Sequence, residues 1–241
     1  MGLISKIFGA EHAAHPFCAA LVPAAGASSR MGGEDKLFAE IGGIPVLART
    51  LMALDNCSGI DEIIIAAREG SVLSVGQLCK DFSITKPTRI VVGGSTRTES
   101  VYLAAIEASR DAQLLAVHDG ARPLVTDKII CDALDMAGKT GAAAPAVPVK
   151  DTIKRAVDGV VVETPDRNDL FAVQTPQVFD ASLLKAALQA AIEANAETTD
   201  DCGAVERLGK KVYLTDGSYD NIKITTPEDL AEAEAIIERR S

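Results

Sequence analysis

The stretch "PAAGASSR", residues 23–30, follows an apolar run and consists mostly of small residues. Small side chains let backbone N–H groups approach an anion closely. Arg30 and Lys36 then place two positive charges near the same loop. The spacing matches neither the dinucleotide-binding fingerprint nor the P-loop. The stretch therefore predicts a site for phosphate groups, although by itself a turn followed by two solvated cations would look the same.

Two further loops carry polar residues of the same kind. In "GGSTRTESV", residues 93–101, two glycines precede the expected beginning of a helix, a position that suits an anion or a base. In "HDGARP", residues 118–123, a carboxylate offers acceptors to hydroxyl groups and an arginine offers a bidentate fork to phosphate. Taken singly, these loops would also suit an ordinary glycine turn and an ion pair that only orders the chain. The candidate residues here are Gly94, Ser95, Arg97, Ser100, Asp119 and Arg122.

Later segments add hydroxyl groups and cations without a nucleophile and its base. The three histidines do not form a spaced metal set, and no Ser–His or Cys–His arrangement indicates covalent catalysis. Phosphoryl and nucleotidyl transfer depend mainly on positioning and charge neutralisation, so a site of this composition favours that chemistry. The later candidates are Thr152, Arg167, Thr175 and Lys223.

The elements that must position these residues alternate along the chain. Short apolar runs, several without strict alternation, are typical of strands buried on both faces, and stretches of helical periodicity lie between them. This pattern predicts an α/β fold with a doubly wound, mainly parallel sheet. Ligands of such sheets bind beyond the carboxyl ends of the strands, where the candidate loops should meet. The expected strands lie within 17–24, 62–68, 89–94, 114–120, 141–149 and 211–215, with helical repeats at 47–54, 101–108, 130–137, 184–191 and from Thr226 onward. Thr126 and Asp180 are the expected N-caps of the third and fourth repeats, and Pro227 is the expected first residue of the last helix.

Residues 150–168 interrupt this rhythm. Two β-forming stretches flank "VDGV", and Asp-Gly between such stretches is a strong hairpin signal. Within a parallel α/β core, the hairpin is expected to project as an arm and to pack on a partner surface in a homodimer; the alternative is a hairpin folded back on its own domain. We assign 17–241 to one domain that includes this arm, and 1–16 to an N-terminal extension without an assigned function.

Composition limits the possible partners and the location. The chain has 241 residues and a net charge of −10, which argues against a general nucleic-acid binder. No segment approaches the ~20 apolar residues of a membrane span. The five cysteines contain no CxxC pair and lack zinc-site spacing, so we expect reduced, buried thiols and a cytoplasmic protein.

Taken in order, the motifs resemble the 2-C-methyl-D-erythritol 4-phosphate cytidylyltransferase family of the non-mevalonate isoprenoid pathway. The resemblance extends from about Cys18 to the C-terminus. The first motif is shared with many nucleotidyltransferases, whereas the last four are more specific. The motifs that carry the resemblance are "PAAGASSRMG", "GGSTRTESV", "HDGARP", "DTIKR", "QTPQVF" and "DNIKITTPEDL".

The resemblance implies a Rossmann-like nucleotidyltransferase fold and a transfer of CMP from CTP to the polyol phosphate, with release of pyrophosphate. It also implies a homodimer whose β-arm crosses to the partner, and Mg²⁺ held mainly by the CTP phosphates rather than by protein ligands. Arg30 and Lys36 match the family's catalytic cations. The matching positions around CTP are Ala24, Ala25, Gly26, Gly94, Ser95 and Ser100, with Arg97 beside them, and those around the polyol phosphate are Asp119, Arg122, Thr152, Arg167, Thr175 and Lys223.

One departure from the family and several alternatives remain. Glu34 and Asp35 precede Lys36 where the family usually has a proline, and this "EDK" is similar to the loop of molybdenum-cofactor nucleotidyltransferases. A cytidylyltransferase for another polyol phosphate, such as ribitol 5-phosphate, would share the same motifs. A non-catalytic dinucleotide-binding module is the alternative of another class, but the chain has no G-x-G-x-x-G turn.

Overall fold

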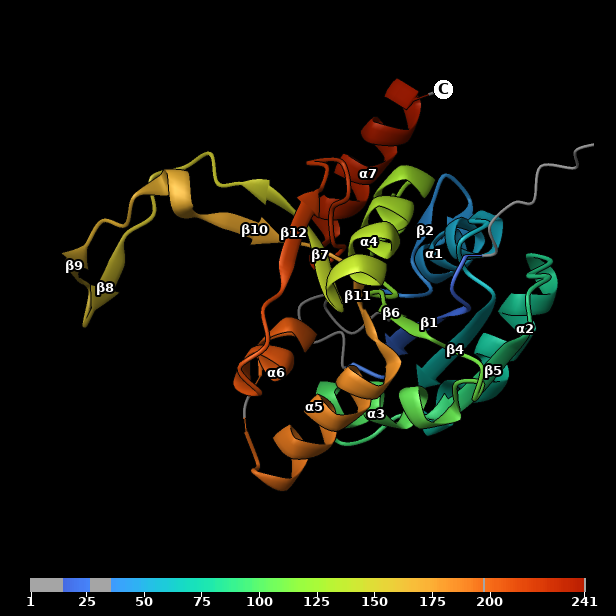
Figure 1. Cartoon of the computed structure of the whole chain (residues 1–241). Helices are drawn as coiled ribbons and strands as arrows, with labels where there is room; N and C mark the ends of the chain where they lie inside the picture. Colours follow the sequence, from blue (N-terminus) through green and yellow to red (C-terminus); the bar gives the residue numbers. More distant parts are fainter. Residues whose placement is uncertain (1–14, 27–35, 197, 241) are drawn as a thin grey trace, which may run out of the picture.

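A computed structural model describes residues 15–26, 36–196 and 198–240, which form a central sheet flanked by helices on both faces (Figure 1). The strand order is β10-β7-β11-β6-β1-β4-β5, with β12 paired to β7. The strands of this sheet are β1 (Cys18–Ala24), β4 (Glu62–Ala67), β5 (Thr88–Val92), β6 (Leu114–Val117), β7 (Ala142–Pro148), β10 (Phe171–Val173), β11 (Gln177–Asp180) and β12 (Tyr213–Asp216).

The sheet is mainly parallel, which confirms the predicted α/β class. β1 pairs in parallel with β4 on one side and with β6 on the other. β4 is buried along its whole length, as the apolar run that follows Glu62 predicts for a strand covered on both faces. Two antiparallel strands, β10 and β11, were not predicted as separate elements; β11 lies between β6 and β7 and pairs with both.

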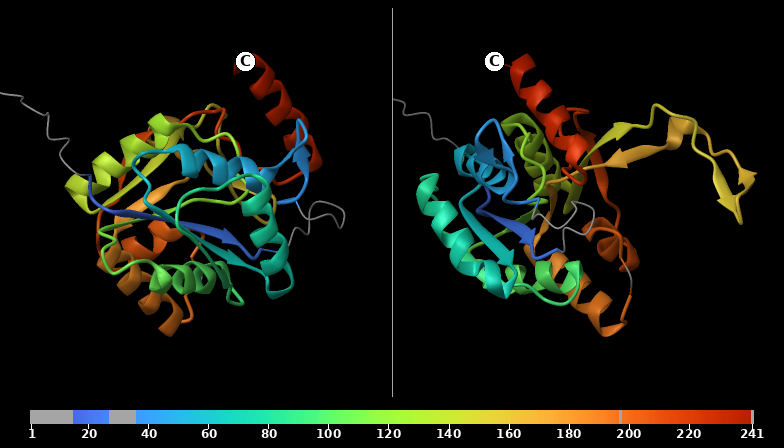
Figure 2. Two further views of the ribbon diagram at one scale, coloured as in Figure 1. Left: turned by 90° about the vertical axis from the view of Figure 1, so that its right-hand side faces the viewer. Right: turned by 180° about the vertical axis from the view of Figure 1, so that it is seen from behind.

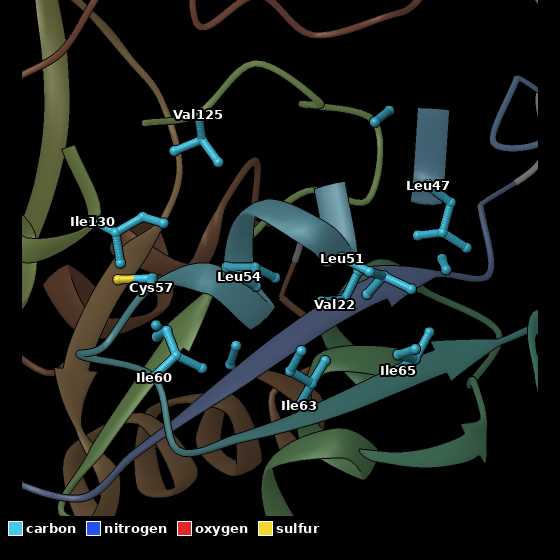
Figure 3. Packing of buried hydrophobic residues seen from close by; sticks show 14 of the residues in the cluster. Val22, Leu47, Leu51, Leu54, Cys57, Ile60, Ile63, Ile65, Val125 and Ile130 are labelled. Carbon is cyan, nitrogen blue, oxygen red and sulfur yellow. The ribbon is translucent and has the colours of Figure 1, made fainter. Parts of the chain in front are cut away.

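The helices cover the two faces of the sheet in separate groups. One core cluster joins β1 and β4 to α1, α2, α4 and α7, and the other joins the opposite faces of these strands to α3, α5 and α6. Figure 3 shows Leu47, Leu51 and Leu54 of α1 packed over Val22 and Ile63 of the sheet, which confirms that helical repeat. The helices are α1 (Val46–Asn56), α2 (Val72–Asp81), α3 (Arg97–Glu107), α4 (Asp127–Thr140), α5 (Ala181–Glu193), α6 (Asp201–Arg207) and α7 (Pro227–Arg240).

Several helix ends are set by local sequence. Thr126 caps α4 and Asp180 caps α5, each through its side-chain oxygen, as predicted. α7 begins at Pro227, whose fixed φ and missing N–H suit a first helical position.

No helix within the described ranges is both long and apolar enough to cross a membrane. The remaining short elements are β2 (Glu40–Ile41), β3 (Ile44–Pro45), η1 (Glu69–Ser71) and η2 (Arg167–Asp169).

The predicted hairpin is present and projects away from the sheet (Figures 1 and 2). It consists of β8 (Arg155–Val157) and β9 (Val160–Glu163), which pair in antiparallel fashion. Asp158 and Gly159 join them with φ values of 50° and 78°, the left-handed conformation that a tight hairpin turn of this kind needs. Every residue of both strands is exposed, including four valines.

Candidate active site

A cleft of about 330 Å³ lies beyond the carboxyl ends of β1, β5 and β6. It brings together the three loops that the sequence singled out, as expected for a doubly wound sheet. Ten predicted residues line it: Ala24, Ala25, Gly26, Lys36, Gly94, Ser95, Arg97, Ser100, Asp119 and Lys223.

Close packing explains the small residues of the first two loops. A Cβ atom on Gly93 would lie 2.6 Å from the Cβ of Ala25 and 2.9 Å from the hydroxyl of Ser100. A Cβ atom on Gly94 would lie 2.4 Å from the Cβ of Glu99. Larger residues would therefore separate β1 from the beginning of α3, so the small residues keep two walls of the cleft in contact.

The beginning of α3 is fixed by a capping box. The Thr96 side chain accepts a hydrogen bond from the Glu99 N–H at 3.1 Å, and the Glu99 carboxylate accepts from the N–H groups of Ser95 and Thr96 at 2.7 and 3.2 Å. The buried hydroxyl of Ser100 donates to the Thr96 carbonyl at 2.8 Å. These bonds position Arg97, the first residue of α3, at the rim of the cleft.

Asp119 is the centre of a group of cations. Its Oδ2 lies 2.9 Å from Lys223 Nζ and 3.3 Å from Arg122 Nε, and its Oδ1 lies 3.8 Å from an Arg97 nitrogen. Burial alone would raise the pKa of Asp119, but these three cations hold it well below its usual range. The carboxylate is therefore ionised at any physiological pH.

Arg97 also pairs with Asp201, which sequence reasoning missed. The distance between Arg97 Nη2 and Asp201 Oδ2 is 2.7 Å, and the Asp201 side chain is almost fully buried. Burial raises the pKa of Asp201 although Arg97 opposes this change. The only sequence signal is the adjacent pair Asp200–Asp201, which caps and begins α6. Arg97 thus bridges two carboxylates of distant segments.

Thr175 and His118 support the Asp119 loop from below the cleft. The Thr175 hydroxyl accepts from the Asp119 N–H at 3.1 Å and lies 3.0 Å from His118 Nδ1. The hydroxyl can then donate to Nδ1, which leaves the Nε2–H to donate to the Arg122 carbonyl at 3.2 Å. Burial lowers the pKa of His118 to about 4, in agreement with this neutral form. The sequence carries no signal for this supporting role of His118.

Arg122 is largely enclosed rather than part of the cleft lining. Beyond its contact with Asp119, one guanidinium nitrogen donates to the Asn221 carbonyl at 2.6 Å. The Asn221 amide in turn donates to the Thr175 carbonyl at 3.0 Å. Arg122 and Thr175 therefore lie under the site and join its loops, and their contact with a substrate remains a prediction.

Two candidates, Thr152 and Arg167, lie apart from the cleft of their own chain. Thr152 and Arg167 are exposed residues of the projecting arm and do not line the cleft. Arg30 lies outside the described residues. Lys36, the last residue of the "EDK" departure from the family, does line the cleft.

This arrangement suits a ligand with several negative charges and hydroxyl groups. Lys36, Arg97 and Lys223 approach one cavity from three separate loops. At an effective dielectric constant near 20, a cation about 4 Å from a phosphate charge contributes roughly 4 kcal/mol before desolvation costs. Asp119 can accept hydrogen bonds from hydroxyl groups while its charge is balanced by the cations.

Comparisons with known proteins agree with this site. The family profile described as IspD, 2-C-methyl-D-erythritol 4-phosphate cytidylyltransferase, matches residues 18–239. Enzymes of that name from Bacillus thuringiensis (strain Al Hakam) and Halalkalibacterium halodurans are each 46% identical over 218 residues, covering 90% of this chain and 96% and 95% of their own.

Solved structures show the same similarity. The 4-diphosphocytidyl-2C-methyl-D-erythritol synthase of Anaerococcus prevotii superposes with a TM-score of 0.83 at 31% identity, covering 92% of this chain and 99% of its own. The 2-C-methyl-D-erythritol 4-phosphate cytidylyltransferase of Thermus thermophilus gives 0.74 at 32% identity, covering 91% and 98%. The chain therefore belongs to the 2-C-methyl-D-erythritol 4-phosphate cytidylyltransferase family.

Proposed function

We propose that the cleft binds CTP and 2-C-methyl-D-erythritol 4-phosphate side by side. Family membership gives the chain its activity, CTP-dependent cytidylyl transfer to this polyol phosphate in isoprenoid biosynthesis. The observation that supports the site assignment is the convergence of Lys36, Arg97 and Lys223 around Asp119 in one cleft.

In the proposed reaction, a phosphate oxygen of the polyol phosphate attacks the α-phosphorus of CTP. One P–O bond forms and the bond to pyrophosphate breaks, so the bonding electrons leave with pyrophosphate and no protein nucleophile is needed. Arg30 and Lys36 neutralise the charge that develops on the triphosphate. The backbone of Ala24–Gly26 and the loop from Gly94 to Ser100 hold the nucleotide.

The acceptor is assigned to the other side of the cleft. Asp119 accepts hydrogen bonds from the polyol hydroxyl groups, and Lys223 contacts the acceptor phosphate. Thr152 and Arg167 reach this region from the arm of a second chain, while Arg122 and Thr175 hold the Asp119 loop in place. Two polyanions must meet here, so fixed cations lower their repulsion and hold the in-line geometry.

Mg²⁺ is the proposed cofactor, held mainly by CTP phosphates. Asp119 is the sole carboxylate among the described residues that line the cleft, and cations already surround it. These lining residues do not form a metal site made of protein ligands alone. Mg²⁺ commonly binds through substrate phosphates instead, which agrees with the proposal. When bound, the ion supplies neutralisation of the triphosphate charge.

We also propose a homodimer formed through the arm, in the cytoplasm. The arm exposes apolar residues, among them Val160 at 66% and Val161 at 54%. Replacing Val161 with Asp should shift the chain from dimer to monomer in sedimentation velocity experiments, whereas Ile106→Asp, at a helix position 48% exposed, should not. A dimer that persists in Val161→Asp would contradict the arm interface.

The five free cysteines are consistent with a reducing compartment such as the cytoplasm. The acidic net charge is consistent with partners other than nucleic acid.

The experiment that tests this function compares two acceptors. Purified protein with CTP and Mg²⁺ should release pyrophosphate when 2-C-methyl-D-erythritol 4-phosphate is added, and far less with ribitol 5-phosphate. Activity with ribitol 5-phosphate alone would assign the chain to another polyol phosphate. Binding of CTP without pyrophosphate release with any acceptor would indicate a binding module.

A further inference from the structure

A second cluster of reactive side chains lies away from the cleft. Cys57 follows the end of α1, while Asp127 and Cys131 belong to the first turns of α4. A cavity of about 320 Å³ lies beside Cys131, and none of its lining residues lines the cleft. The cytidylyl transfer described above uses none of these three residues.

The spacing of the donor atoms is that of a tetrahedral thiolate site. The two sulfur atoms are 3.9 Å apart, and the ligand atoms of Cys57, Asp127 and Cys131 all lie within 4.8 Å of one another. With Zn–S bonds of about 2.3 Å and tetrahedral angles, two thiolates on one zinc ion are roughly 3.8 Å apart. A disulfide would need the sulfurs to approach to about 2.05 Å, so it requires a movement that metal binding does not.

The three ligands are held on fixed backbone. Asp127 and Cys131 are four residues apart on α4 and share one face of the helix. The backbone N–H of Cys57 donates to the Leu54 carbonyl at 3.3 Å, and its carbonyl accepts from the Ile60 N–H at 3.2 Å and from the Lys86 ammonium. Figure 3 shows Cys57 beside Ile130, the residue before Cys131. Little rearrangement would be needed to bring the ligands together.

The surroundings leave room for a further ligand. A Cβ atom on Gly59 would lie 3.9 Å from both sulfurs, so the chain passes beside the cluster without placing a side chain on it. Gly59, Cys131 and His15 line the adjacent cavity. A water molecule in this cavity can complete a four-coordinate site.

We propose that Cys57, Cys131 and Asp127 bind one thiophilic divalent cation of the zinc class, with water as fourth ligand. The ion joins the end of α1 to α4 and so ties the segment before β4 to the helix that follows the Asp119 loop. Thiolate ligands exclude Mg²⁺, which prefers oxygen, so the site is distinct from the Mg²⁺ of the transfer reaction.

The test uses Co²⁺ as a spectroscopic probe on the full chain, reduced and treated with chelator. One Co²⁺ per chain should bind and give a thiolate-to-metal charge-transfer band, which Zn²⁺ abolishes by displacement and excess Mg²⁺ leaves unchanged. The double variant Cys57→Ser/Cys131→Ser should lose the band. Cys79→Ser, which removes a half-buried thiol of α2, should retain it.

Asp127→Asn separates ligation from folding, because Asp127 is exposed and both thiols remain. The affinity of this variant for Zn²⁺ is measured by competition with a chromophoric chelator. Loss of a residue that only hydrogen-bonds to a metal ligand typically lowers metal affinity by roughly 10- to 100-fold, and loss of the direct ligand Asp127 should lower it by at least as much. Circular dichroism should show that all variants are folded. Absence of a charge-transfer band in the parent chain, its persistence in the folded double variant, or unchanged affinity in Asp127→Asn would each overturn the proposal.

Discussion

The ammonium group of Lys223 lies 2.9 Å from Oδ2 of Asp119, and the two residues come from segments far apart in the sequence. Asp119 follows the central strand β6, whereas Lys223 lies between β12 and α7. Arg97 and Arg122 approach the same carboxylate from two further directions. The ion pair therefore joins the middle of the chain to its C-terminal part at the cleft, where the acceptor is proposed to bind.

Lys223→Met should mainly weaken binding of the polyol phosphate. A hydrogen bond to a charged group contributes about 1.5–3 kcal/mol, so KM for the acceptor should rise about tenfold or more while KM for CTP changes little. Steady-state kinetics with each substrate varied in turn measures this. Lys80→Met, at an exposed position of α2, is the matched control. Equal increases in both KM values would place Lys223 outside the acceptor site.

Lys36→Ala should reduce kcat strongly. Its charge is proposed to act on the triphosphate as pyrophosphate leaves, and loss of one such group typically costs about 100- to 1000-fold in kcat. Single-turnover release of pyrophosphate measures the chemical step directly. A near-normal rate would show that the residues before Lys36 direct its side chain elsewhere in the cleft.

Arg167→Ala should raise KM for the acceptor by about tenfold, because a guanidinium–phosphate contact is lost. Arg155→Ala, in the same arm but paired with Glu163, should behave like the parent enzyme. Verified mixed dimers of Arg167→Ala and Lys36→Ala subunits contain one intact site if the arm serves the neighbouring subunit. At acceptor concentrations below the parent KM, such dimers should recover up to half of the parent activity; no recovery would mean that both residues serve one subunit's site.

His118 should make stability depend on pH between about 4 and 6.5. Its pKa is about 4 in the folded protein and near 6.5 when unfolded, so the unfolded chain binds a proton in this range and the folded chain does not. The free energy of unfolding should therefore be highest above pH 6.5 and fall by up to about 3 kcal/mol as the pH decreases to 4.

Urea denaturation at several pH values checks this expectation. His118→Asn should be less stable at neutral pH, because the hydrogen bond to the Arg122 carbonyl is lost, but it should lack most of the slope between pH 4.5 and 6.5. Carboxylates with lowered pKa, such as Glu99 and Asp229, contribute below this window and provide the common background. An unchanged slope in His118→Asn would assign the pH dependence to other groups.

Sequence alone predicted the features that depend on neighbouring residues. The apolar run of β4, the caps Thr126 and Asp180, and the Asp158–Gly159 turn all follow from local preferences of side chain and backbone. The loops of the cleft were also identifiable, because the carboxyl ends of parallel strands meet at one edge. Family motifs then supplied the ligand, which these loops by themselves did not specify.

Tertiary structure decided what depends on contacts between distant segments. The insertion of β11 between β6 and β7, the pairing of Arg97 with Asp201, and the proximity of Cys57 and Cys131 across 74 positions have no local sequence signal. Each arises because buried strands and helices bring remote side chains into one low-dielectric environment, where charges and polar groups must find partners. The sequence thus determined the secondary-structure elements and the chemistry of the cleft. Packing determined which residues, such as Thr175 and His118, hold the loops of the cleft in place.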